Sequence, residues 1–76
     1  MIDVDEMDLS LTAMHRIIKK SGAERVSDEA MKELRNALED IGLRISKEAW
    51  DFTKHAKRKT VKIEDIQIAV KKVLKE

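Results

Sequence analysis

Residues 27–56 read SDEAMKELRNALEDIGLRISKEAWDFTKHA, and this stretch decides the fold. Its apolar side chains recur at steps of three or four residues, at Leu34, Leu38, Ile41, Ile45, Ala49, Phe52 and Ala56. The steps average about 3.7 residues, close to the α-helical period of about 3.6. Ser27 is a suitable N-cap, and Asp28 and Glu29 complement the positive end of the helix dipole. The stretch therefore predicts one long, unbroken helix.

This predicted helix is too long for the chain that contains it. At about 1.5 Å per residue it spans roughly 40 Å or more. A compact globule of 76 residues is only about 30 Å across. Part of the apolar stripe must then be covered by something outside the chain's own core. The simplest cover is a second copy, so we predict an obligate dimer in which two such helices cross.

Two shorter amphipathic helices are predicted on either side. The first runs over residues 10–21, with Ser10 as its N-cap and Gly22 at the position where a left-handed residue ends a helix. The second runs from about Ile63 to Leu74, with acidic residues in its first turn and lysines in its last. The predicted fold class is all-α, with the order short helix, long helix, short helix.

The composition allows one domain and argues against several classes of function. The chain has no cysteine, hence no disulfide framework and no thiolate zinc site. His15 and His55 fall on different predicted helices without a carboxylate cluster, and no nucleophile or glycine-rich phosphate motif is present. No apolar run approaches the length of about 20 residues that spans a membrane. We expect an intracellular protein that is not an enzyme, with no cofactor, no metal and no membrane contact.

The small net charge of +1 conceals an asymmetry. Residues 1–9 form an acidic arm with four acids and no base, whereas the domain of residues 10–76 holds all 16 Lys and Arg against 11 acids. A dimer of that domain would carry a charge of about +10, which suits a polyanionic partner. The arm has two interpretations: a solvated, frayed terminus, or a segment that competes with an anion for the basic surface or covers a neighbouring subunit.

Two motifs give the chain a family resemblance. The first motif resembles the first helix and first loop of archaeal histones, and it comprises residues 16–19 (RIIK) and 22–27 (GAERVS). The second motif resembles their second loop and third helix, and it comprises residues 55–62 (HAKRKTVK), 64–66 (EDI) and 69–70 (AV). The similarity extends over roughly residues 12–74. It implies the histone fold, in which two chains form a handshake dimer and the first loop of one chain lies beside the second loop of its partner.

The resemblance also implies a function. Archaeal histones bind, bend and compact double-stranded DNA with little sequence specificity, so we expect a chromosomal protein of the cytoplasmic nucleoid. The expected partners are double-stranded DNA, a second copy of the chain or a related histone, and further dimers that join on DNA. By this resemblance Arg25 inserts into the DNA minor groove, where a narrow groove concentrates negative potential. The alternative for Arg25 is a solvated side chain or a salt bridge to Glu24 or Asp28.

The remaining candidate DNA contacts lie at the helix ends and in the second loop. Lys59, Thr60 and Lys62 resemble a phosphate-binding segment, although a charge run is often only a solvated surface. The other candidates are Arg16, Lys19 and Lys20, which also complement the dipole of their helix, Ser27, which is first a helix cap, and Lys57. Lys57 stands where the family commonly has glycine, and a lysine in left-handed geometry would cost on the order of 1 kcal/mol.

Further roles follow from the resemblance alone. Arg58 and Asp65 are expected to form an internal ion pair that braces the second loop. The surface through which dimers join is expected to contain Phe52, His55, Asp65 and Ile68, with Phe52 bulkier than the usual aliphatic residue. Gly22 is expected where successive turns of an array stack closely. Trp50 lies off the apolar stripe and is expected to pack against the third helix or the partner.

Two rival functions stay open at this point. The first is a histone-fold interaction module, such as a transcription-factor subunit that requires a heterologous partner. The second is a helical assembly protein whose basic loops bind no nucleic acid. A stable dimer of one gene product distinguishes the histone from the first rival, and salt-sensitive binding to unrelated duplexes distinguishes it from the second.

Overall fold

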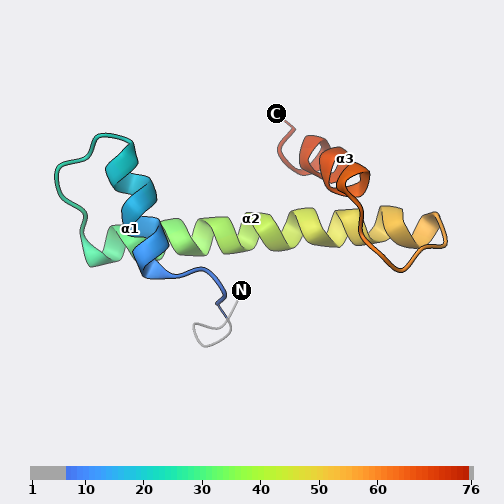
Figure 1. The fold of residues 1–76 in the computed structure, drawn as a ribbon, viewed down its shortest axis with the longest axis horizontal. Coiled ribbons are helices and arrows are strands. Elements are labelled where there is room, and N and C mark those ends of the chain that lie inside the picture. The colour runs from blue at the N-terminus through green and yellow to red at the C-terminus, as the bar shows by residue number, and fades with distance from the viewer. Residues whose placement is uncertain (1–6, 76) are drawn as a thin grey trace. The chain divides into compact units, whose positions relative to one another are not determined.

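The computed structural model describes residues 7–75. Within this part the chain forms three helices and no strand: α1 (Leu11–Lys20), α2 (Asp28–His55) and α3 (Ile63–Val73) (Figure 1). Helix α2 contains 28 residues, against 10 in α1 and 11 in α3. The predicted order of short, long and short helices is confirmed. Over the same residues, no helix combines the length and apolar character needed to cross a membrane.

Serine side chains begin the first two helices, as the sequence predicts. The Ser10 hydroxyl accepts the backbone N–H of Ala13 at 3.0 Å, at the start of α1. The Ser27 hydroxyl accepts the N–H of Ala30 at 3.1 Å, at the start of α2. Each bond satisfies one of the N–H groups that the first turn of a helix leaves without a partner.

Each of these helices is followed, two residues after its last residue, by a residue with positive φ. Gly22 follows α1 with φ of 105°, and Lys57 follows α2 with φ of 59°. After α2, the N–H of Lys57 binds the carbonyl of Lys54 at 2.8 Å and that of Arg58 binds the carbonyl of Thr53 at 3.1 Å. This pair of bonds is a Schellman motif, which satisfies the last carbonyls of the helix. The expected left-handed geometry of Lys57 is confirmed.

The chain divides into two compact units, each containing part of α2. Unit 1 is Met1–Asp40, with α1 and the first part of α2, and unit 2 is Ile41–Glu76, with the rest of α2 and α3. Of the described apolar side chains, only Met14 in unit 1 and Ala49 and Ala69 in unit 2 are buried. The large apolar side chains that stay exposed are Leu9, Ile17, Leu43, Trp50, Val61, Ile63, Ile66, Ile68 and Leu74. Each unit therefore has a very small core of its own.

The predicted acidic arm is only partly described. Its residues 1–6 lie outside the described residues. At its end, the N–H groups of Asp8 and Leu9 both donate to the same carboxylate oxygen of Glu39 in α2, with a distance of 2.8 Å for Asp8. Residues 8 and 9 are thus tied to unit 1, which differs from a frayed terminus.

Candidate nucleic-acid interface

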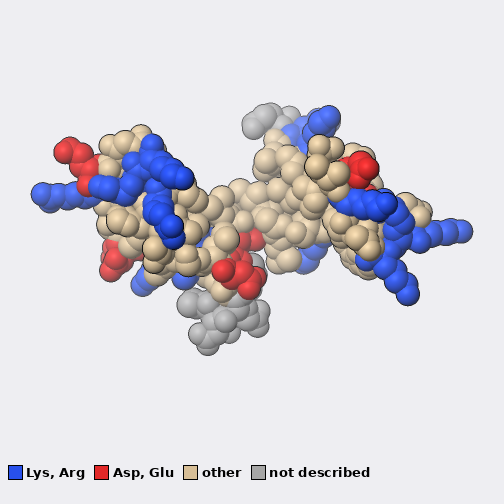
Figure 2. Space-filling view, viewed as in Figure 1, with Lys and Arg blue, Asp and Glu red and all other residues tan. Residues whose placement is uncertain are grey.

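Exposed cations gather around the two loops that connect the helices. Loop 1 comprises residues 21–27, between α1 and α2, and loop 2 comprises residues 56–62, between α2 and α3. Figure 2 shows Lys and Arg side chains over α1 and loop 1, and also over loop 2. The predicted DNA-contacting cations are all exposed: Arg16, Lys19, Lys20, Arg25, Lys57, Lys59 and Lys62. Loop 2 itself carries Lys57, Lys59 and Lys62, whereas loop 1 carries Arg25 and the other three cations lie in the adjoining α1.

Loop 1 holds the main chain on both sides of Arg25. Before it, the Lys19 ammonium donates to the carbonyl oxygen of Glu24 at 2.7 Å. After it, Ser27 caps α2. Among residues 7–75, the Arg25 side chain forms no ion pair with Glu24 or Asp28, so the salt-bridge interpretation does not hold in this structure. The guanidinium is free to contact an external anion.

Loop 2 is held by a carboxylate that lies almost out of solvent. The side chain of Asp65, in the first turn of α3, is 4% exposed and forms a two-armed ion pair with Arg58, with both N···O distances at 2.9 Å. Its Oδ2 atom also accepts the Thr53 hydroxyl at 2.7 Å and the backbone N–H of Lys62 at 2.9 Å. The predicted ion pair between Arg58 and Asp65 is present, and it joins α2, loop 2 and α3.

These contacts determine the charge state of the pair. The hydrogen bonds from Arg58 hold the pKa of the Asp65 carboxyl well below its usual 3.8, and the Lys62 N–H and the Thr53 hydroxyl lower this pKa further. The same contact with Asp65 raises the pKa of the Arg58 guanidinium. Both groups stay charged near neutral pH, so the brace of loop 2 does not switch in that range.

Thr53 is a part of this network that sequence reasoning missed. Its side chain is fully buried, and its oxygen lies 2.7 Å from Asp65 and 2.9 Å from the Ala49 carbonyl. A hydroxyl has one proton, and the ionised carboxylate is the stronger acceptor, so the proton points to Asp65. The sequence carried no signal for this bond, because helical threonines commonly bond the carbonyl four residues earlier and Asp65 is twelve residues away along the chain.

Arg58 also fixes the segment that carries the predicted phosphate contacts. Its Nη1 atom donates to the Thr60 carbonyl at 3.0 Å as well as to Asp65. Lys59 and Thr60 thereby lie on a main chain held from within, with exposed side chains. Lys62 is the N-cap residue of α3, and its ammonium is also exposed. Arg58 is structural, as the resemblance implies, and it supports the residues that face solvent.

The residues predicted to join dimers differ in accessibility. His55 is exposed, Ile68 is 51% exposed and Phe52 is half-buried. Asp65 is buried, and four hydrogen bonds to its own chain occupy its carboxylate. The interface role of all four residues stays a prediction, and for Asp65 the observed role is to brace loop 2.

A glycine is needed at position 22 because of the backbone conformation there, and not because a larger side chain would lack space. A Cβ atom built on it would meet no other atom within 4 Å, but its φ of 105° lies in a region that other residues rarely adopt. The close approach of a second molecule predicted at Gly22 therefore stays a prediction. Trp50 is 40% exposed, with the Lys54 ammonium 5.9 Å from its ring centroid, so it is only partly packed.

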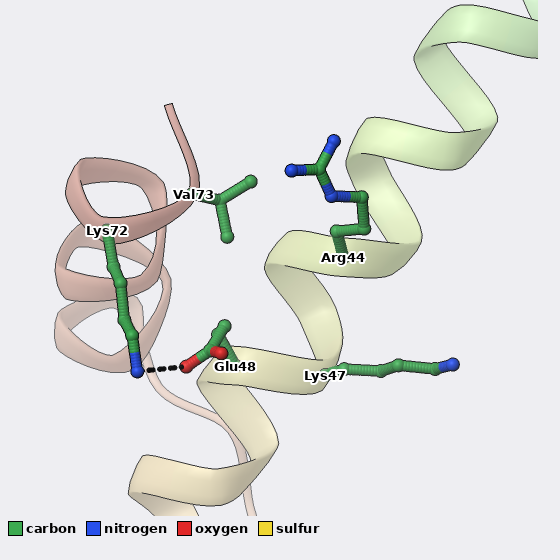
Figure 3. Close-up of a pocket in the computed structure, with 5 residues that line it drawn as sticks. All are labelled: Arg44, Lys47, Glu48, Lys72 and Val73. Atoms are coloured by element: carbon green, nitrogen blue, oxygen red, sulfur yellow. Dashed lines mark ion pairs between the residues drawn. The ribbon is translucent and has the colours of Figure 1, made fainter. Parts of the chain in front are cut away.

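A hollow of about 350 Å³ in unit 2 is the kind of feature that could suggest a small-molecule site. It is open to solvent, and it is lined by Val73 and four charged residues from α2 and α3 (Figure 3). The ion pair between Lys72 and Glu48, at 3.1 Å, crosses it. Small-molecule sites are mostly enclosed and carry few charged groups, whereas this hollow is open and four of its five lining residues are charged. Over residues 7–75, no three His, Cys, Asp or Glu side chains come together in a way that could hold a metal ion.

Comparisons with known proteins agree with these features. Residues 7–70 match the family described as histone-like transcription factor (CBF/NF-Y) and archaeal histone. The chain is 47% identical over 64 residues to one of the subunits of archaeal histone HAN1 from Thermococcus zilligii, and 48% identical over 64 residues to probable archaeal histone 3 of Methanocaldococcus jannaschii. Each alignment covers 84% of this chain and 96% of the relative.

A more distant similarity extends beyond these relatives. Histone H4 of Entamoeba histolytica is 30% identical over 60 residues, covering 79% of this chain and 51% of that protein. The family match covers α1, loop 1, α2 and loop 2 in full, and α3 as far as Val70. With its three-helix order, the exposed cations at its two loops and these matches, the chain belongs to the family of histone-like transcription factors (CBF/NF-Y) and archaeal histones.

Proposed function

We propose that this archaeal-type histone binds and bends double-stranded DNA as a homodimer, largely without regard to base sequence. The observation that carries the proposal is the exposed Arg25, whose side chain has no partner among residues 7–75, on a main chain held at Glu24 and Ser27. Such a side chain suits a narrow minor groove, which attracts arginine through its enhanced negative potential. The protein then acts on the chromosome and has no catalytic role.

The small core of each unit supports the dimer. Only three apolar side chains are buried among those described, whereas Ile63, Ile68 and Leu74 are at least half exposed. Burial of apolar surface stabilises a protein by about 25 cal/mol per Å². A chain of 76 residues with so little buried apolar surface gains much from a partner that covers the rest. A second copy in the handshake arrangement supplies matching apolar surface.

Loop 2 supplies the phosphate contacts in this proposal. Lys59 and Lys62 neutralise phosphates, and the Thr60 hydroxyl gives a directional hydrogen bond. Lys57, Arg16 and Lys20 add charge, and the N–H groups behind Ser27 can receive a phosphate at the start of α2. In the handshake dimer, loop 1 of one chain would lie beside loop 2 of its partner. Arg25 of one chain and the phosphate-binding lysines of its partner would then contact the same stretch of DNA.

Replacement of Arg25 tests the proposal directly. Arg25→Ala should weaken DNA binding and lower the rate at which short linear DNA closes into rings, because the groove contact is lost. Arg35→Ala, which removes an arginine outside both loops, serves as the control, and cross-linking checks that both variants remain dimers. Ring closure by Arg25→Ala at the wild-type rate would contradict the assigned role.

Titration with salt tests the affinity for DNA itself. Binding to unrelated duplexes should weaken steeply as salt rises, with a log–log slope of about 0.9 per neutralised phosphate. Nuclease digestion of the complexes then reports assembly: a ladder of protected lengths means that dimers add in series, through the predicted surface of Phe52, His55, Asp65 and Ile68. Salt-insensitive binding, or binding to one duplex only, would exclude a general DNA-compacting protein.

A second candidate function is a histone-fold subunit that needs an unlike partner. The family description includes transcription factors, and one relative is named as a subunit. Sedimentation of the purified chain distinguishes the two cases. A stable homodimer supports the histone, whereas an unfolded or aggregated chain that becomes soluble only with a related histone supports the subunit.

A further inference from the structure

The contacts of Lys19 with loop 1 were not predicted from the sequence. Its main-chain carbonyl accepts the N–H of Gly22 at 3.0 Å, which closes the turn after α1. Its side chain then extends over the same turn, and its ammonium donates to the carbonyl of Glu24 at 2.7 Å. Lys19 therefore holds loop 1 at two points, Gly22 and Glu24. The second point lies five residues after Lys19 along the chain.

The second of these points, Glu24, lies immediately before Arg25. Glu24 shares a peptide bond with Arg25, so its carbonyl orientation sets the plane of the Arg25 amide. Two residues further on, Ser27 caps α2 and fixes the other side. The Arg25 main chain is thereby held between two hydrogen-bonded residues, although every residue of loop 1 except Ala23 and Val26 is exposed.

The neighbouring Lys20 provides a contrast. It has the same charge, lies in the same last turn of α1 and is also exposed. Among residues 7–75 its ammonium forms no hydrogen bond or ion pair, so it can turn toward an external phosphate. The Lys19 ammonium would have to leave the Glu24 carbonyl to do the same, and such charge-assisted bonds are stronger than neutral ones.

We infer that Lys19 is a positioning residue for Arg25, which holds loop 1 in its DNA-binding conformation, and that it is not a phosphate contact. The inference rests on the proposed function, because it assumes that Arg25 contacts DNA. Its physical basis is preorganisation: a loop that is already ordered loses less conformational entropy when it binds. Lys20 keeps the role of a phosphate contact.

A double-mutant cycle separates the two roles. Lys19→Met and Lys20→Met keep most of the side-chain length and remove the ammonium, and each is made in the wild type and with Arg25→Ala. DNA affinity is measured by fluorescence anisotropy over a salt series. We expect Lys19→Met to weaken binding about three- to tenfold in the wild type, to leave the salt slope unchanged, and to have almost no effect beside Arg25→Ala.

Lys20→Met should behave differently. It should lower the salt slope by about 0.9 for each lysine lost from DNA, and by the same amount in both backgrounds. Lys19→Arg keeps a cationic donor and should bind DNA nearly as the wild type does. In the free protein, NMR relaxation should show larger amplitude motion of the Glu24 and Arg25 amides in Lys19→Met but not in Lys20→Met.

The outcomes identify which idea is wrong. If Lys19→Met lowers the salt slope as Lys20→Met does, and its effect adds to that of Arg25→Ala, Lys19 is a phosphate contact and the inference is overturned. Unchanged amide motion in Lys19→Met would overturn it as well. If Arg25→Ala alone binds DNA normally, the proposed role of Arg25 fails, and the inference about Lys19 fails with it.

Discussion

Loop 1 and loop 2 both present cations at a helix end, and each is held by a cation that bonds a main-chain carbonyl next to an exposed cationic residue. In loop 1 the Lys19 ammonium binds the Glu24 carbonyl, beside Arg25. In loop 2 the Arg58 guanidinium binds the Thr60 carbonyl, beside Lys59. The arrangement is shared, but the support behind it is not.

The support differs in burial and in number of bonds. Arg58 is anchored by the buried Asp65, which also binds Thr53 and the Lys62 N–H. Lys19 has no described acid behind it, and its bond to Glu24 is exposed to water. A guanidinium can bond a carbonyl and a carboxylate at once because its donors point in fixed, diverging directions. Loop 2 is therefore anchored to a buried carboxylate of unit 2, whereas loop 1 is held locally and is easier to perturb without unfolding.

The largest effect is expected from Asp65→Asn, which removes the charge at the centre of the loop 2 brace. Arg58 then loses its ionic partner in a part-buried site, and the amide cannot accept all four hydrogen bonds. We expect the largest fall in Tm of all the variants considered, measured by circular dichroism at one fixed protein concentration. Asp51→Asn, which removes only the exposed pair with Lys54, should leave Tm nearly unchanged.

Asp65→Asn also tests how the stability of the protein depends on pH. Because the folded pKa of Asp65 lies below its usual 3.8, its contribution to stability is present above that pH and is lost as the pH falls below it. The wild type should lose stability between neutrality and strong acid more steeply than Asp65→Asn. Equal acid sensitivity of the two proteins would show that Asp65 does not titrate as described.

A smaller effect is expected from Thr53→Val, which keeps the shape of the side chain and removes one hydrogen bond to Asp65. The loss should be about 1–2 kcal/mol in the free energy of unfolding, because Asp65 then lacks one buried donor. Chemical denaturation measures it. Thr12→Val, on the exposed part of α1, is the control and should change stability by less than about 0.5 kcal/mol. A Thr53→Val protein as stable as wild type would mean that the hydroxyl adds nothing to the brace.

Ser27→Ala tests loop 1 in the same way. The cap of α2 is lost, which should cost about 1 kcal/mol in the free energy of unfolding. Ser46→Ala, inside α2, should be neutral or slightly stabilising because alanine has the higher helix propensity. Ser27→Ala should also release the main chain on one side of Arg25, so DNA binding should weaken more in Ser27→Ala than in Thr53→Val. Weaker DNA binding in Thr53→Val than in Ser27→Ala would show that the Ser27 cap does not position Arg25.

The smallest effect is expected at Lys57, and it is a gain. Lys57→Gly should stabilise the protein by about 0.5–1 kcal/mol, because glycine adopts the observed φ of 59° without the steric cost. Lys47→Gly, inside α2, should instead lose about 1 kcal/mol. A destabilised Lys57→Gly protein would mean that the Lys57 side chain forms contacts worth more than the backbone strain.

Sequence reasoning predicted the features that depend on neighbouring residues. The bounds of α1, α2 and α3 agree with the predicted helices to within about a residue at each end, and both serine caps and the left-handed turns at Gly22 and Lys57 are present. The ion pair of Arg58 with Asp65 was expected from family resemblance alone. Three contacts were missed: Thr53 with Asp65, Lys19 with the Glu24 carbonyl, and Glu39 with the N–H groups of Asp8 and Leu9.

The sequence by itself determined the helices and their ends, because periodicity, capping and positive φ act over a few residues along the chain. It also determined the number of cations in each loop. Only the tertiary structure decided which cations face solvent and which hold a loop in place. A lysine or arginine side chain is long and flexible enough for either role, and the choice depends on whether folding brings a carbonyl or a carboxylate within its reach.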